Sequence, residues 1–185
     1  MESDILENTC SFFGHRDIEI TDALVTQIEN IVVNLIENNS VERFLFGSKS
    51  MFNDLCHKIV TELKNKYSNI IRVAYPCVSE DPVLEKDKVQ LENACSKVLG
   101  TKVSLQTYDE IVENEKIWRA GKSAYIQRNY KMIEDSDFCV FYYSLAYIPK
   151  EKTRCNKMIY YQPKSGTKLA YDYAIKKNKN VIKIN

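Results

Sequence analysis

The sequence predicts an α/β fold, a three-layer sandwich around a mainly parallel sheet, from three observations. Short apolar runs bounded by turn residues recur along the chain, as strands do. Between them lie longer stretches with apolar residues every three or four positions, which is typical of amphipathic helices. The chain has 185 residues, of which 44% are hydrophobic, and this suits one core better than two. We therefore expect one domain over residues 1–185, with right-handed crossovers between parallel strands.

The apolar runs and the periodic stretches place the individual elements. We expect strands at Thr9–Phe13, Arg43–Phe46, Ile70–Tyr75, Lys102–Gln106, Phe138–Tyr143 and Val181–Ile184. We expect helices at Asp22–Glu37, Ser50–Tyr67, Val83–Leu99, Gly121–Glu134 and Gly166–Lys177. Thr21 or Asp22 is available to cap the first helix, and Ser165 to cap the last. The stretch from Thr107 to Ala120 shows no clear period, so it predicts no element.

Composition narrows the class of protein. The N-terminal residues lack the basic, apolar and small-residue pattern of a signal peptide, and no apolar run has the length of a membrane span. The six cysteines form no C-x-x-C pair, and His15 and His57 show no zinc spacing. We therefore expect a soluble cytoplasmic protein with reduced thiols, no metal ion, no cofactor and no membrane partner.

Three loops combine glycine or hydroxyl residues with a cation. Two follow predicted strands and one precedes the last predicted helix: Gly14-His15-Arg16, Gly47-Ser48-Lys49-Ser50 and Lys164-Ser165-Gly166-Thr167. Backbone N–H groups at a glycine, hydroxyl donors and a positive charge are the partners that a phosphate group needs. Each loop alone is also what an ordinary turn contains. Because such loops converge at the carboxyl edge of a parallel sheet, the three together favour a phosphate-bearing ligand there.

Arg128 and Asn129 lie on the apolar face of the helix expected at Gly121–Glu134. A cation on a buried face needs an anionic partner. Either Arg128 forms an internal ion pair, for instance with Asp137 or Asp54, or Arg128 and Asn129 point into the ligand cleft. The sequence leaves both alternatives open.

The last part of the chain is rich in basic residues and in tyrosine. From Pro149 to Asn185, ten lysines or arginines stand against Glu151 and Asp172. Such a block either attracts phosphate-bearing partners, nucleic acid among them, or forms the solvated face of a helix. The connection Ser144–Lys164 is too long for an ordinary crossover, and its tyrosines either stack on a base as a lid or pack on the domain's own surface.

Four segments together resemble the SLOG superfamily, in particular a bacterial branch near the YpsA-like proteins. They are TCSFFGHRDI, FLFGSKSMFNDLC, GKSAYIQRNYKMIEDSDFCVFYY and QPKSGTKLAYDYA, and the match spans almost the whole chain. The resemblance implies a Rossmann-like sheet that binds nucleotides or nucleotide-derived molecules, often as a sensor and in some members as an enzyme. The ligand contacts that it implies are Gly14, His15, Arg16, Gly47, Ser48, Lys49, Arg128, Asn129, Ser165, Gly166 and Thr167. Ser50, from the second loop, completes the set of candidate binding residues.

Two departures from the family bear on chemistry. The branch places an aspartate directly after the phenylalanine of the second motif, whereas Asn53 stands here and the acid is Asp54. Enzymes of the Lonely Guy type, which hydrolyse the N-glycosidic bond of nucleoside monophosphates, carry a glutamate after P-G-G-x-G-T. Lys168 follows the Gly-Thr pair here, so the carboxylate that this chemistry needs is missing. Asp172 and Glu134 are candidate catalytic substitutes, although neither belongs to a motif.

These observations favour a cytoplasmic binding module for a nucleotide-derived, phosphate-bearing ligand, such as an ADP-ribose-type signal, at the carboxyl edge of the sheet. The alternative is a nucleotide N-glycosidase or phosphoribohydrolase with a shifted carboxylate. A third hypothesis is single-stranded nucleic-acid binding, because one SLOG relative binds single-stranded DNA. The missing glutamate favours the first hypothesis over the second, and a homo-oligomer is compatible with all three.

Overall fold

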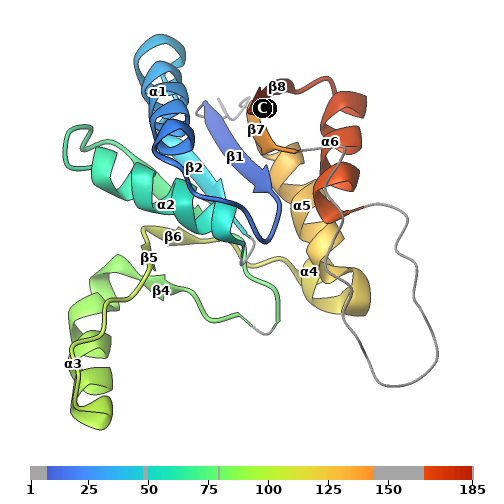
Figure 1. Ribbon diagram of the computed structural model, residues 1–185. Helices are drawn as coiled ribbons and strands as arrows, with labels where there is room; N and C mark the ends of the chain where they lie inside the picture. The colour runs from blue at the N-terminus through green and yellow to red at the C-terminus, as the bar shows by residue number, and fades with distance from the viewer. Residues whose placement is uncertain (1–7, 48–49, 79, 144–164, 185) are drawn as a thin grey trace, which may run out of the picture.

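The computed structural model describes residues 8–47, 50–78, 80–143 and 165–184 (Figure 1). Within these residues, parallel strands form a six-stranded sheet in the order β6-β3-β2-β1-β7-β8. The strands are β1 (Thr9–Gly14), β2 (Arg43–Phe46), β3 (Ile71–Ala74), β6 (Glu110–Ile111), β7 (Phe138–Tyr142) and β8 (Asn180–Ile184). Helices cover both faces, so the predicted three-layer α/β sandwich with a Rossmann-like sheet is confirmed.

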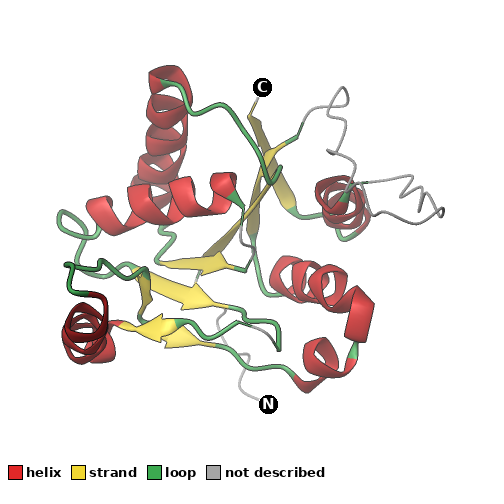
Figure 2. Cartoon of the chain, turned by 60° about the horizontal axis from the view of Figure 1, so that its bottom comes forward, coloured by secondary structure: helices red, strands yellow, loops and turns green. Residues whose placement is uncertain are grey.

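The alternation of side chains along each strand divides the core into two layers. The main covering helices are α1 (Asp22–Asn39), α2 (Met51–Leu63), α5 (Ala124–Glu134) and α6 (Gly166–Lys176). Phe12 of β1 packs in the layer of α1 and α2, whereas its neighbour Phe13 packs in the layer of α5 and α6. Figure 2 shows helices on either side of the strands. Because a sheet buried on both faces needs apolar residues at successive positions, its strands read as continuous apolar runs in the sequence.

Hydroxyl side chains begin three of these helices. Thr21 caps α1, Ser50 caps α2 and Ser165 caps α6, each by accepting a hydrogen bond from the backbone N–H three residues later. The caps predicted at Thr21 and Ser165 are therefore confirmed.

The segment between β3 and α5 differs from the prediction. It contains β4 (Val83–Leu84), the 3₁₀ turn η1 (Glu85–Asp87), α3 (Lys88–Leu99), β5 (Thr107–Tyr108), β6, α4 (Glu115–Arg119) and the 3₁₀ turn η2 (Gly121–Ser123). The strand predicted at Lys102–Gln106 is wrong, and β4 pairs with β5 instead. The helix predicted from Val83 begins at Lys88, and the regular helix predicted from Gly121 begins at Ala124.

A polar cluster around the buried side chain of Arg72 explains these short strands. Arg72 of β3 donates to Glu85 at 2.9 Å, and the Glu85 carboxylate also accepts a hydrogen bond from the Thr107 hydroxyl. These bonds hold β4 and β5 beside β3, although neither strand is long enough to show an apolar period. Helix α3, which lies between β4 and β5 in the sequence, stands away from the sheet in Figure 1, and none of its residues is buried.

Within the described ranges, no helix is long and apolar enough to cross a membrane. The same residues contain no group of three or more His, Cys, Asp or Glu side chains placed to hold a metal ion. The described cysteines are free thiols, buried at Cys10, Cys56, Cys77 and Cys139 and partly buried at Cys95.

Candidate functional site

The carboxyl ends of β1 and β7 meet at the point where the strand order of the sheet reverses. From β1 the chain crosses through α1 to β2 on one side, whereas β7 pairs with β1 on the other side. Gly14 and Tyr142, the last residues of the two strands, are register partners. Open parallel sheets bind ligands at such a switch point, so the side chains around Gly14 define the candidate site.

Gly14 joins helices from both layers. A Cβ atom at this position would lie 2.3 Å from the Phe52 ring of α2, so only glycine allows this approach. On the other side, the Thr167 hydroxyl of α6 donates to the Gly14 carbonyl at 3.0 Å. The predicted loop residues Gly14 and Thr167, 153 positions apart, are thus in direct contact.

The residues after Gly14 follow the same edge. His15 is buried, and its ring centroid lies 5.8 Å from that of Tyr143 and 6.4 Å from that of Tyr142. Arg16 is exposed, and its carbonyl accepts from the Met51 N–H at 2.9 Å. The loop therefore places the His15 ring near Tyr142 and Tyr143 and brings Arg16 next to the first turn of α2.

Asn53 links α2 to the central strand. Its side-chain amide donates to the Phe12 carbonyl at 3.1 Å, and Asn53 is buried. An ionised aspartate cannot donate this bond, which gives a physical reason for an amide at the position where the resembling branch has an acid. Asp54 is exposed on the next position of the helix.

Arg128 approaches the end of β2 from the opposite layer. A Cβ atom at Gly47 would lie 2.5 Å from Met132 Sδ and 2.8 Å from Arg128 Cδ, so glycine makes room for both side chains. The Arg128 side chain is only 1% exposed, and its Nη1 donates to Glu80 Oε2 at 2.8 Å. The guanidinium carbon also lies 4.9 Å from the centroid of the Tyr125 ring.

The ion pair of Arg128 corresponds to one of the two alternatives that the sequence left open, but with another partner. The partner is Glu80, in the loop after β3, and not Asp137 or Asp54. Asp137 instead accepts from the backbone N–H of Thr9 at 3.0 Å. Sequence reasoning missed Glu80 because no motif or apolar period surrounds it.

The start of α6 supplies further polar groups. Ser165 caps the helix, Gly166 is exposed, and Thr167 contacts Gly14. Lys168 forms an ion pair with Asp172 one turn later, and its Nζ lies 5.8 Å from the centroid of the Tyr143 ring. The carboxylate of Asp172 is therefore engaged along the side of α6.

Other predicted residues lie apart from this group or outside the described residues. Glu134, at the far end of α5, accepts from the Tyr173 hydroxyl at 2.5 Å and lies 3.5 Å from Lys177, near the start of β8. Asn129 is half-buried next to Arg128. Ser48, Lys49 and the connection 144–164 fall outside the described ranges.

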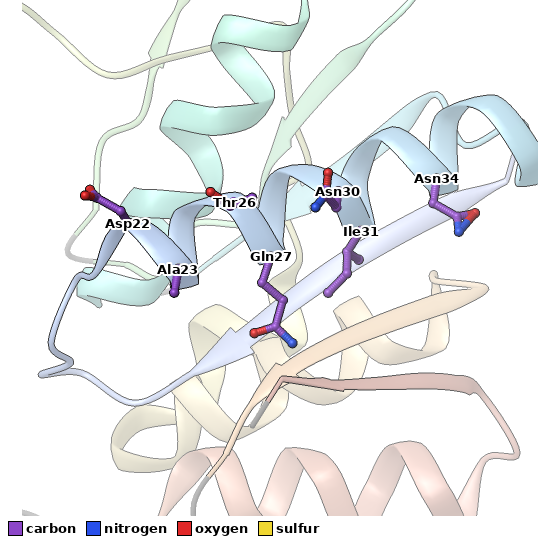
Figure 3. Close-up of a pocket in the computed structure, with 7 residues that line it drawn as sticks. All are labelled: Asp22, Ala23, Thr26, Gln27, Asn30, Ile31 and Asn34. Atoms are coloured by element: carbon purple, nitrogen blue, oxygen red, sulfur yellow. The ribbon is translucent and has the colours of Figure 1, made fainter.

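Two surface hollows lie elsewhere. An open groove of about 690 Å³ runs along α1, and Figure 3 shows the side chains that line it: Asp22, Ala23, Thr26, Gln27, Asn30, Ile31 and Asn34. A second hollow of about 430 Å³ shares Ile31 and Asn34 and continues to β7 and β8. Neither includes a predicted site residue. Their linings are uncharged apart from Asp22 and Lys179, so they offer little counter-charge to a phosphate group, whereas the carboxyl edge has cations and helix N-termini.

No family model matches the chain, and no curated protein matches it either. The fold and the switch-point loops define a Rossmann-like α/β protein. The resemblance to the SLOG superfamily stays a prediction, and function has to be argued from the side chains themselves.

Proposed function

We propose that the protein is a binding module for a nucleotide-derived, phosphate-bearing ligand at the carboxyl edge of β1, β2 and β7. The observation that carries the proposal is the meeting of Gly14, the first turn of α2 and the first turn of α6. Helix N-termini carry unpaired N–H groups and a partial positive charge, which together favour phosphate oxygens. Two such helix ends beside one strand suit a ligand with two phosphate groups.

Charge and aromatic surface near this point support a nucleotide rather than a bare anion. Arg16 is exposed on the loop that follows β1, and Arg128 lies at the end of β2. Tyr143 is half-buried at the end of β7, beside His15. Rings of this kind stack on a base or a ribose, and cations pair with the phosphates. ADP-ribose combines all of these groups and serves as the probe.

The proposal is tested by calorimetric titration of the full chain with ADP-ribose, AMP and adenosine. We expect ADP-ribose to bind most tightly and adenosine, which has no phosphate, not to bind. Arg16→Ala should weaken the binding of ADP-ribose about tenfold, because it removes an exposed cation beside the phosphates. Arg119→Ala, on an exposed residue of α4, is the matched control and should bind as the unchanged protein does.

Two results would contradict the proposal. If no phosphate compound gives a heat of binding at millimolar concentration, the protein does not bind a ligand of this class. Tighter binding of a single-stranded oligonucleotide than of ADP-ribose, with a steep salt dependence, would favour nucleic acid as the partner instead.

A further inference from the structure

The contact between Arg128 and Glu80 uses only part of the hydrogen-bonding capacity of each group. Arg128 Nη1 donates to Glu80 Oε2 at 2.8 Å, and this is the only hydrogen bond of Arg128 to a described residue. Arg128 Nε and Glu80 Oε1 are both buried, and neither has a hydrogen-bond partner within the described ranges. A guanidinium group and a carboxylate can form two parallel bonds, so a single bond with two orphaned atoms is an incomplete pair.

The place that the Glu80 carboxylate fills has the donors of an anion site. Glu80 Oε2 accepts from Arg128 Nη1 at 2.8 Å and from the backbone N–H of Cys77 at 2.9 Å. A guanidinium group and a backbone N–H are the donors that proteins use for phosphate oxygens. Gly47, directly after β2, leaves room for the Arg128 side chain, because a Cβ atom at position 47 would clash with it.

From these contacts we infer that Glu80 is an internal competitor of the ligand: its carboxylate occupies the anion position on Arg128, and a phosphate group of the ligand displaces it. This inference rests on the proposed function. A phosphate group carries more charge and more acceptor oxygens than the carboxylate does, so it is the stronger partner for Arg128 and the Cys77 N–H. The exposed fraction of the Glu80 side chain is 9%, against 1% for Arg128, so Glu80 is the partner closer to solvent.

The competition sets both affinity and selectivity. A ligand binds more weakly when the competent state is a minority, by the fraction of molecules in that state. If the Glu80 pair holds about nine molecules in ten, removal of the carboxylate charge strengthens binding about tenfold. Compounds without phosphate gain nothing, because they cannot replace a carboxylate on a guanidinium group.

The test compares the binding of ADP-ribose by the unchanged protein, Glu80→Gln and Glu80→Ala, with circular dichroism to establish that each variant is folded. Both variants should bind ADP-ribose about tenfold more tightly. Glu29→Gln, on an exposed residue of α1, is the control for the loss of one negative charge and should leave the affinity unchanged. In an Arg128→Ala background, Glu80→Gln should fail to restore binding of ADP-ribose, because the two residues act through the same contact.

A measurement on the unchanged protein keeps the inference testable if a variant fails to fold. In ¹H–¹⁵N spectra, the signals of the Cys77 backbone N–H and of Arg128 Nε–H should shift saturably when ADP-ribose is added. Affinity that is unchanged or weaker in folded Glu80 variants, or signals that do not move at saturation, would overturn the inference while the binding module stands. If neither the unchanged protein nor the variants bind any phosphate compound, the proposed function fails, and the inference fails with it.

Discussion

Two buried arginines of this protein, Arg72 and Arg128, differ in how completely their guanidinium groups are bound. Arg72 donates from Nε and Nη2 to Asp109 at 3.1 and 3.0 Å, from Nη2 to Glu85 at 2.9 Å and from Nη1 to Thr61 at 3.1 Å. Among the residues that the structure describes, Arg128 donates one hydrogen bond, to Glu80. The side chains are equally hidden, at 3% and 1% exposure, so burial does not account for the difference.

The comparison distinguishes a structural arginine from an arginine that still has hydrogen-bond donors without a described partner. Lys64 also pairs with Asp109 at 2.8 Å, so the anion beside Arg72 is held from two sides. Burial alone would raise the pKa of Asp109, but the hydrogen bonds from Arg72 and Lys64 outweigh it and hold the pKa at about 2. A cluster whose hydrogen bonds are all formed stabilises the fold. A buried guanidinium group with unused donors can instead contribute binding free energy to an anionic ligand.

The largest expected effect is a loss of stability in Arg72→Ala. This change leaves the largely buried Asp109 carboxylate without its guanidinium partner, and breaking a buried ion pair typically costs about 3–5 kcal/mol. Urea denaturation measures the free energy of unfolding. Arg43→Ala, which removes a partly exposed ion pair with Glu110, is the control and should cost less than about 1 kcal/mol. Equal losses in the two variants would show that the Arg72 cluster is not structural.

The second prediction concerns pH, because His57 belongs to the Arg72 cluster. Burial lowers the pKa of His57 from 6.5 to about 4, and the hydrogen bond of Nε2 to the Thr107 carbonyl, at 2.7 Å, only partly offsets it. Since the folded pKa is depressed for a base, the unfolded state binds more protons between these two values. The free energy of unfolding should therefore fall as pH drops from about 6.5 to 4, by up to about 3 kcal/mol.

Urea denaturation at a series of pH values measures this loss. His57→Asn should flatten the curve over the same range, since asparagine does not titrate. The charged groups near the ring are Arg72, Asp109 and Glu85, and Asp109 contributes only at lower pH because its own pKa is about 2. A curve of unchanged slope in His57→Asn would assign the pH dependence to other groups.

Among these variants, we expect Arg128→Ala to have the smallest effect on stability. Its effect on ligand binding should be large. One hydrogen bond to a charged group is lost, so we expect a cost of about 1–3 kcal/mol in the free energy of unfolding, less than for Arg72→Ala. Binding of ADP-ribose should become undetectable. Arg128→Lys should restore it in part, because a point charge cannot reproduce the planar fork of a guanidinium group. If Arg72→Ala and Arg128→Ala lost the same stability and the same binding, the distinction between a structural and a ligand-binding arginine would be wrong.

Local patterns in the sequence predict most of the sheet and part of the candidate site. The strands β1, β2, β3, β7 and β8 are long enough for their apolar runs to mark them, and the cap at Ser165 follows from its hydroxyl beside Gly166. Loop chemistry predicts Gly14 and Thr167 as separate site residues, and the fold brings them into contact.

Other features depend on contacts that local sequence does not encode. The two-residue strands β4, β5 and β6 have no period, and the Arg72 cluster holds β4 and β5 through Glu85 and Thr107. Glu80 lies in a loop without a motif, so its pairing with Arg128 emerges only from the packing of α5 against the end of β2. Partners that meet through tertiary packing are the part that pattern reasoning misses.

The central position of β1 has a consequence for synthesis of the chain on the ribosome. One neighbour of β1 is β2, which begins at Arg43, whereas the other is β7, which begins at Phe138. At about 5–20 residues per second, β1 and β2 leave the ribosome several seconds or more before β7 does. During this interval the apolar edge of β1 has no strand beside it, and such an open edge pairs readily with other chains. The nascent protein is therefore expected to need protection by a chaperone until β7 arrives.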